Sequence, residues 1–175
     1  MNITVLGGGA WGTAIAISAA RHHAPQSVCL WARNAKQIEA LSIDAENKQY
    51  LPAIPLPDGL LLEPDFQKAL GRLGSDDVLV IATPMSGLSQ ILENVLTQAK
   101  HPLNILYLCK GLEPLTALLP HQVLQRELAK HPTHRHAFGV LSGPSFAREV
   151  GEGLPCALTV ASHQHEFCAL VQRAF

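Results

Sequence analysis

The chain has 175 residues, of which 47% are hydrophobic and 15% charged, and its formal net charge is −1. This composition fits one sizeable domain with its own core and excludes a disordered chain. The balanced charge, without a basic stripe, argues against a nucleic-acid partner. The longest apolar stretches are far shorter than the roughly 20 residues that span a bilayer, so we expect no membrane span.

Cysteine and histidine usage indicates a reduced, metal-free protein. The four cysteines are widely spaced and form no C-x-x-C pair, which is typical of cytoplasmic thiols. No spacing among the nine histidines matches a zinc pattern, so we expect no metal site. Residues 3–6 already read as a strand and leave no room for a signal peptide. The expected location is therefore the cytoplasm.

The most informative motif is G-x-G-x-x-G at residues 7–12, with Ala10 and Trp11 inside it. It follows the predicted strand 3–6 and opens a predicted helix over residues 11–21, the context in which this motif is typical of a dinucleotide-binding turn. Gly7 allows the tight turn, Gly9 lets a pyrophosphate approach the backbone, and Gly12 lets the helix pack closely on the strand. The free N–H groups of the helix N-terminus would face the phosphates. The alternative is a plain strand-to-helix turn without a ligand.

The next predicted strand, residues 28–32 after Pro25, ends in W-A-R-N. In the NAD form of the motif an Asp or Glu stands about 20 residues on. Here no acid is present, and Arg33 lies 21 residues after Gly12. A guanidinium is a fork of donors suited to phosphate, so Arg33 favours NADP through its 2′-phosphate, or stacks on adenine. NAD use stays open, and a solvated Arg at a strand end is the alternative.

Strand and helix patterns continue to alternate along the chain. Pro52, Pro55 and Pro57 predict an ordered surface loop over residues 47–59, since proline blocks both ladders and helix interiors. Further strands are expected at residues 60–62, 78–82 (ended by Thr83 and Pro84), 104–108, 138–141 and 157–160. Further helices are expected at residues 35–42, 86–98 and 118–130. This order predicts an α/β fold with a doubly wound, mostly parallel, Rossmann-like sheet whose ligands lie beyond the carboxyl ends of the strands.

Two further strand ends carry candidate anion-binding groups. Lys110 follows the strand 104–108 and would direct its ammonium into the crevice, although a surface lysine is the alternative. S-G-P-S-F-A at residues 142–147 ends another strand and opens a helix, with Pro144 in the first turn and Ser142 or Gly143 as the cap. The free N–H groups of that helix would form a second anion site. A capped helix start without a ligand is the alternative.

The last ten residues repeat apolar side chains with helical spacing, at Phe167, Leu170, Val171 and Ala174. The chain stops at Phe175 without a helix stop signal. We therefore expect it to be an N-terminal fragment or a truncated version of a longer protein.

Together these motifs resemble one family. G-G-G-A-W-G-T-A, W-A-R-N, Y-L-P at residues 50–52, C-K-G-L-E at residues 109–113 and S-G-P-S-F-A-R-E at residues 142–149 are similar to bacterial NAD(P)-dependent glycerol-3-phosphate dehydrogenase, in the same order. The resemblance implies a cytoplasmic oxidoreductase that interconverts dihydroxyacetone phosphate and sn-glycerol 3-phosphate for phospholipid synthesis.

The resemblance also implies roles for particular residues. Its cofactor contacts correspond to Trp11, Arg33, Lys110 and Ala147, with Tyr50 a further cofactor-side position. Its substrate contacts correspond to Lys110, Gly143 and Ser145. From the motif and the strand ends we add Gly7, Gly9, Ala10, Gly12 and Pro84 on the cofactor side.

In the family the general acid/base is a lysine of a following helical domain, beyond Phe175. We therefore predict that residues 1–175 form the dinucleotide-binding domain, without the catalytic helical domain. This polypeptide should bind NADP in preference to NAD and turn over substrate poorly.

Two alternatives remain for the function. One is a related 6-phosphogluconate or β-hydroxyacid dehydrogenase, and the other is a non-catalytic nucleotide-binding module. A homo-oligomer formed through exposed apolar surface is a further expectation.

Overall fold

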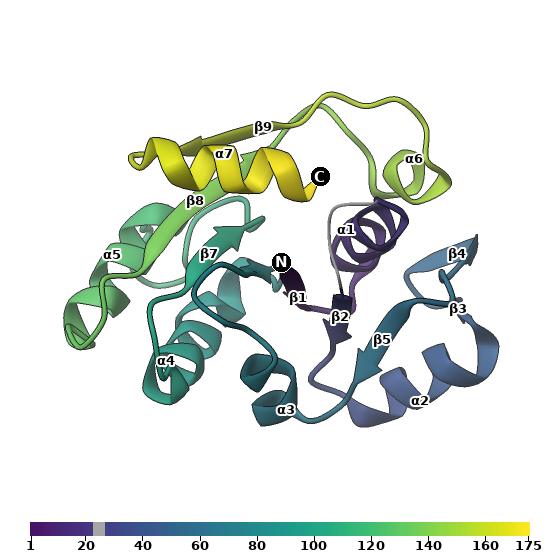
Figure 1. Cartoon of the computed structure of the whole chain (residues 1–175), viewed down its shortest axis with the longest axis horizontal. Helices are drawn as coiled ribbons and strands as arrows, with labels where there is room; N and C mark the ends of the chain where they lie inside the picture. The colour runs from purple at the N-terminus through teal and green to yellow at the C-terminus, as the bar shows by residue number, and fades with distance from the viewer. Residues whose placement is uncertain (23–26) are drawn as a thin grey trace.

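The computed structural model describes residues 1–22 and 27–175, so Pro25, the predicted boundary of the second strand, lies outside the described residues. Within the described part, seven strands form one sheet in the order β5-β2-β1-β6-β7-β8-β9 (Figure 1). All neighbours pair in parallel except β8 and β9, which are antiparallel. The strands are β1 (Asn2–Leu6), β2 (Ser27–Trp31), β5 (Leu60–Glu63), β6 (Val78–Ile81), β7 (Asn104–Tyr107), β8 (Ala137–Ser142) and β9 (Thr159–Ser162). The predicted doubly wound, mostly parallel sheet is confirmed.

The central strands are apolar along their whole length because both of their faces are covered. In β6, Val78 and Val80 belong to one core cluster, and Leu79 and Ile81 belong to the other. Successive side chains of a strand point to opposite faces, so a strand between two helical layers needs an apolar residue at every position.

Helices cover the two faces of the sheet in separate layers. On one face lie α1 (Ala10–Arg21), α6 (Ala147–Glu152) and α7 (His165–Ala174), and on the other lie α3 (Phe66–Gly71), α4 (Leu88–Gln98) and α5 (Pro120–Lys130) (Figure 1). The helix α2 (Ala35–Asp44) packs Ile38 and Leu41 into the first layer. No helix of the described residues is both long and apolar enough to cross a bilayer.

The chain order creates a crevice next to β1. From β1 the chain builds outward through β2 to β5, and it then returns to the other side of β1 to build β6, β7 and β8. The connections that follow β1 and β6 therefore diverge at the carboxyl edge of the sheet. Open α/β sheets bind ligands at such a switch point.

The structure corrects the prediction that residues 47–59 form a loop. A small antiparallel pair is present instead, formed by β3 (Glu46–Asn47) and β4 (Leu51–Pro55). Pro52 and Pro55 are exposed in β4. Both prolines are compatible with a strand here, because each strand of a two-stranded pair has one edge that needs no N–H donor.

Other corrections are smaller. The helix α3 was not predicted, and the last strand lies at Thr159–Ser162 rather than at residues 157–160. Pro144 is not in a helix, since α6 begins at Ala147. The predicted C-terminal helix is confirmed, and α7 buries Phe167, Val171 and Ala174.

Candidate functional site

A cleft of about 1110 Å³ lies at the carboxyl edge of the sheet. Its walls are the segments that follow β1, β2, β6, β7 and β8. The predicted site residues that line it are Gly7, Gly9, Ala10, Trp11, Arg33, Tyr50, Pro84, Lys110, Ser145 and Ala147. Two predicted residues, Gly12 and Gly143, do not line it. The volume suits a large cofactor, since small-molecule sites commonly measure about 300–1,000 Å³.

The three motif glycines differ in what surrounds them. Gly7 has a φ of +137°, and a Cβ there would lie 2.6 Å from the carbonyl oxygen of Ala82. A Cβ on Gly12 would lie 2.0 Å from the carbonyl oxygen of Gly7, so α1 packs directly on the turn. A Cβ on Gly9 would meet nothing within 4 Å. The turn therefore needs Gly7 and Gly12 for its own geometry, and it leaves open space at Gly9, as a dinucleotide-binding turn requires.

The N-terminus of α1 offers unpaired donors to this space. Gly9 is the N-cap, and no described side chain caps the helix or places a carboxylate in its first turn. The first intrahelical bond runs from the Thr13 N–H to the Gly9 carbonyl, at 2.9 Å. The N–H groups before Thr13 therefore lack helical acceptors, and the positive end of the helix dipole lies beside them. This arrangement favours an anion.

The charges around the cleft have one sign. Arg33 and Lys110 line it, and no Asp or Glu is among the described residues that do so. Both cations are exposed, and neither forms an ion pair with a described residue. The cleft therefore suits a ligand that carries several negative charges.

Three polar side-chain atoms of cleft-lining residues are buried without a partner among the described residues. They are Trp11 Nε1, Thr83 Oγ1 and Ser145 Oγ. Buried polar atoms in proteins nearly always find a hydrogen-bond partner. Their clustering at one cleft points to a polar ligand. Of the three, Thr83 was predicted at a strand end but was given no binding role.

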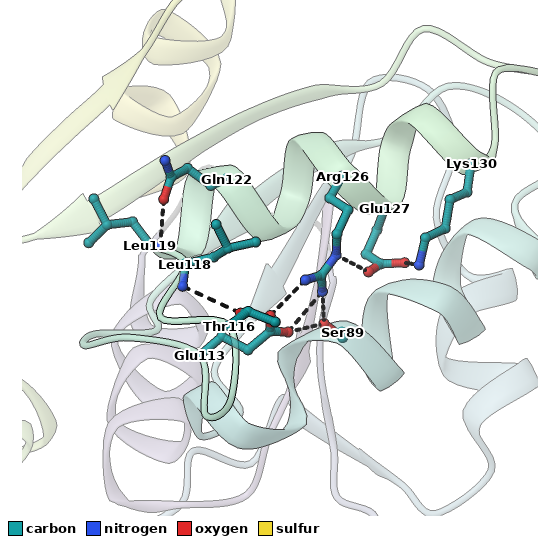
Figure 2. A network of polar contacts seen from close by, with 9 residues as sticks. All are labelled: Ser89, Glu113, Thr116, Leu118, Leu119, Gln122, Arg126, Glu127 and Lys130. Atoms are coloured by element: carbon teal, nitrogen blue, oxygen red, sulfur yellow. Dashed lines mark hydrogen bonds and ion pairs between the residues drawn. The ribbon is translucent and has the colours of Figure 1, made fainter.

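The loop after Lys110 is held by an ionic network that joins it to α4 and α5 (Figure 2). The carboxylate of Glu113 accepts two hydrogen bonds from Arg126 of α5, at 2.7 and 2.8 Å, and one from the hydroxyl of Ser89 in α4. The hydroxyl of Thr116 also donates to it. Glu113 thus ties the loop that begins at Lys110 to two helices.

The network keeps the carboxylates of Glu113 and Glu127 ionised. Hydrogen bonds from Arg126, Ser89 and Thr116 lower the pKa of Glu113 to about 2. Burial opposes the ionisation of Glu127, but Lys130 and Arg126 together hold its pKa below the usual value. Glu113 and Glu127 are therefore charged at neutral pH and neutralise Arg126 and Lys130. Lys110 is not part of this network.

The cysteine beside Lys110 is not a reactive group. Burial raises the pKa of the Cys109 thiol to about 11, and its Sγ donates to the carbonyl oxygen of Thr83, at 3.1 Å. A thiol with so high a pKa carries almost no thiolate at neutral pH. Cys109 is therefore a packing residue at the floor of the cleft.

The predicted second anion site at residues 142–147 is not formed by a helix N-terminus. Phe146 is the N-cap of α6, and its N–H donates to the Glu149 carboxylate, at 3.3 Å. That carboxylate occupies the place where an anion would bind. Gly143 packs against the segment that leads into β9, since a Cβ there would lie 2.4 Å from the carbonyl oxygen of Ala157. Ser145 and Ala147 remain at the cleft.

Sequence reasoning missed two residues that contact the glycine turn. The side chains of Gln37 in α2 and Asn47 in β3 both donate to the carbonyl oxygen of Gly8, at 2.5 and 3.0 Å. Neither residue belongs to a recognisable motif. Only the fold brings them to the turn.

The fold and the position of the cleft define a Rossmann-like α/β domain. Residues 2–168 match the family described as NAD-dependent glycerol-3-phosphate dehydrogenase N-terminus, and the chain belongs to this family.

Relatives with known names agree with this assignment. The glycerol-3-phosphate dehydrogenase (NAD(P)+) of Polynucleobacter necessarius subsp. necessarius is 58% identical over all of this chain, and that of Cupriavidus necator is 44% identical. The chain spans about half the length of these relatives, 52% in both cases.

Solved structures show the same fold. The glycerol-3-phosphate dehydrogenase of Coxiella burnetii superimposes with a TM-score of 0.83 at 29% identity, over 99% of this chain and 50% of that one. The UDP-D-ManNAc dehydrogenase of Pyrococcus horikoshii has a TM-score of 0.72 at 15% identity, over 99% of this chain and 44% of that one, and shares the fold alone.

Proposed function

We propose that residues 1–175 form the dinucleotide-binding domain of an NAD(P)-dependent glycerol-3-phosphate dehydrogenase. The observation that carries this proposal is the uncapped N-terminus of α1 beside the open space at Gly9. It faces a cleft that no Asp or Glu of the described residues lines. The diphosphate of a nicotinamide nucleotide has the charge and shape for such a site. Gly7, Gly9, Ala10 and Trp11 would surround it, and Tyr50, Pro84 and Ala147 would line the rest of the bound nucleotide.

NADPH is the proposed preferred cofactor. Arg33 stands at the end of β2, where an NAD-selective domain carries an acid, and it is free to pair with a 2′-phosphate. NADH would bind at the same place without that ion pair.

The proposed substrate is a phosphorylated triose, dihydroxyacetone phosphate in the reductive direction. The bound nicotinamide would supply the hydride. Lys110 would stabilise the negative charge that develops on the ketone oxygen, and the free hydroxyl of Ser145 would bind a substrate oxygen. A substrate role for Gly143 remains a prediction from the family resemblance.

The catalytic proton donor is proposed to lie in a helical domain outside these residues. This proposal rests on the half-length match to the relatives. We expect the 175-residue polypeptide to bind NADPH and to reduce dihydroxyacetone phosphate slowly or not at all. An assay of NADPH oxidation tests this, with a full-length relative such as the Cupriavidus necator enzyme as positive control. Turnover on the order of 1–10³ per second, the usual range for enzymes, would contradict it.

We further propose a cytoplasmic location and self-association. Leu112 and Leu115 in the loop after Lys110 are 54% and 106% exposed, and Phe146 at the cleft is 73% exposed, so these side chains offer apolar surface to a second copy. Sedimentation at high concentration tests the second point, and a monodisperse monomer would contradict it.

A further inference from the structure

We propose that Asn47 and Gln37 are positioning residues for nucleotide binding, because together they fix the peptide that joins Gly8 to Gly9. This inference rests on the proposed function, in which the glycine turn holds the diphosphate. Asn47 does not line the cleft and would act only through the turn.

Two side-chain amides hold the carbonyl group of Gly8. Its oxygen accepts from Gln37 Nε2 at 2.5 Å and from Asn47 Nδ2 at 3.0 Å. A carbonyl oxygen has two lone pairs, and both donors come from elements outside the turn. The oxygen is therefore held toward α2 and β3.

The peptide between Gly8 and Gly9 is planar, so its two polar groups are fixed relative to each other. In a trans peptide the C=O of one residue and the N–H of the next point in opposite directions. Holding the Gly8 oxygen toward the two amides directs the Gly9 N–H away from them. Without this restraint a glycine-glycine peptide could rotate and turn a carbonyl, with its partial negative charge, toward the phosphate.

Asn47 is buried, at 2% exposed, and its amide uses both N–H donors and one of the two lone pairs of Oδ1. Besides Gly8 it donates to Thr13 Oγ1 of α1, at 2.7 Å. Its Oδ1 accepts from the N–H of Tyr50, at 3.2 Å. One amide thus joins the turn, the first helix and the hairpin that carries Tyr50. An Asn buried at this depth needs such a set of partners.

Asn47→Leu, Asn47→Asp and Gln37→Leu test the proposal in the 175-residue protein. Leu removes the donors without adding charge, and Asp keeps the acceptor for Tyr50 but removes both donors. Asn104 is the control because its Nδ2 likewise donates two hydrogen bonds, here to the backbone carbonyls of Ser75 and Asp77, at 2.8 and 2.9 Å. Asn104 lies at the opposite, amino edge of the sheet. Asn104→Leu and Asn104→Asp therefore remove an equivalent clamp away from the cleft.

The measurements are the dissociation constants of NADPH, ADP and adenosine, together with thermal unfolding. We expect the Asn47 variants to bind NADPH and ADP with about tenfold lower affinity, as loss of roughly one hydrogen bond predicts. Adenosine, which lacks the diphosphate, should bind as it does to the unchanged protein. The Asn104 variants should leave all three affinities within about twofold. Folded Asn47 variants with unchanged ADP affinity, or with equal losses for ADP and adenosine, would overturn the proposal.

A second measurement separates this proposal from the proposed function. In the ligand-free protein, the ¹³C′ shift of Gly8 and the exchange rate of the Gly9 amide report the orientation of the peptide directly. We expect both to change in Gln37→Leu, a substitution at a half-buried helix position, and to stay unchanged in Asn104→Leu. Unchanged values in Gln37→Leu and Asn47→Leu would overturn the positioning role, whether or not the unchanged protein binds NADPH. Failure of the unchanged protein to bind NADPH would count against the proposed function alone.

Discussion

Arg33 is the exposed side chain on which the proposed preference for NADPH depends. It lines the cleft at the end of β2, and the next residue, Asn34, caps α2 by accepting from the Lys36 N–H, at 3.1 Å. The capped helix fixes the backbone on which the guanidinium is carried. Selectivity would then depend on the charge of this single side chain rather than on the shape of the cleft.

Arg33→Asp should shift preference from NADPH to NADH. A carboxylate would repel the 2′-phosphate and accept from a ribose hydroxyl, so we expect NADPH affinity to fall about 10- to 100-fold, the range for loss of a charged hydrogen bond. Equilibrium titration with both nucleotides measures this. Lys36→Asp is the control, since Lys36 is exposed nearby but outside the cleft lining. Unchanged NADPH affinity in Arg33→Asp would remove Arg33 from the site.

Single residues could be predicted from sequence where their task is local. Gly7 is required by its own positive φ and Gly12 by its approach to Gly7, five residues earlier, so a short motif identified them. Asn47 and Gln37 could not be found in this way, because their partner Gly8 lies 39 and 29 residues away. Their role depends on tertiary packing that no short pattern encodes.

At the scale of elements, the segment after β7, which begins beside the cleft at Lys110, contains several strained backbone conformations. Gly111, Leu115 and Ala117 all have positive φ, at 94°, 74° and 54°. Only Gly adopts this region at little cost. Glu113 stands between them and anchors the segment to α4 and α5 (Figure 2). The anchor offsets backbone strain in the loop that presents Lys110.

Glu113→Gln should loosen this loop and lower stability. The neutral amide cannot accept both Arg126 hydrogen bonds, and we expect a loss of about 1–3 kcal/mol in unfolding free energy, with weaker NADPH binding through Lys110. Denaturant unfolding and nucleotide titration measure the two effects. Glu152→Gln is the control, because its ion pair with Arg148 joins side chains that are 37% and 60% exposed and should contribute less than about 1 kcal/mol. Equal small effects in both variants would contradict the anchoring role.

Two of the differences from the sequence prediction, β4 and the start of α6, have a similar cause. β4 pairs only with β3, so its prolines are tolerated where a central strand would exclude them. The start of α6 shifted from Pro144 to Ala147 because the side chain of Glu149 reaches back to Phe146 and caps the helix there. In both cases a tertiary or capping contact outweighed the local preference of proline. The buried strands were predictable because apolar side chains on both faces leave a continuous signal.

At the scale of the whole molecule, acid should destabilise the fold in two separate pH ranges. His136 is 8% exposed, and its Nδ1 accepts from the Leu103 N–H, at 3.1 Å, so it is unprotonated there. Burial, with the nearby His134, His101 and His131, lowers its pKa to about 4. The unfolded chain therefore takes up the proton first as the pH falls below about 6.5.

Stability should fall between about pH 6.5 and pH 4 by at most about 3 kcal/mol from His136. Glu113, whose folded pKa is about 2 against 4.5 when unfolded, should add a further loss between about pH 4.5 and pH 2. Unfolding free energies across this range test both. His136→Asn keeps an acceptor for Leu103 but cannot titrate, so it should abolish the first slope. The exposed His121→Asn should keep it, and an unchanged slope in His136→Asn would contradict the assignment.

The proposed function depends on the binding of a nicotinamide nucleotide by the glycine turn. Titration of NADPH onto isotope-labelled protein, followed by NMR, tests this most directly. We expect saturable binding with the largest shift changes at Gly9, Ala10 and Trp11, and at Arg33. No saturable binding to folded protein would contradict it. So would shifts confined to the smaller hollow at the opposite edge of the sheet, which is lined by Gln67, Leu73 and His101.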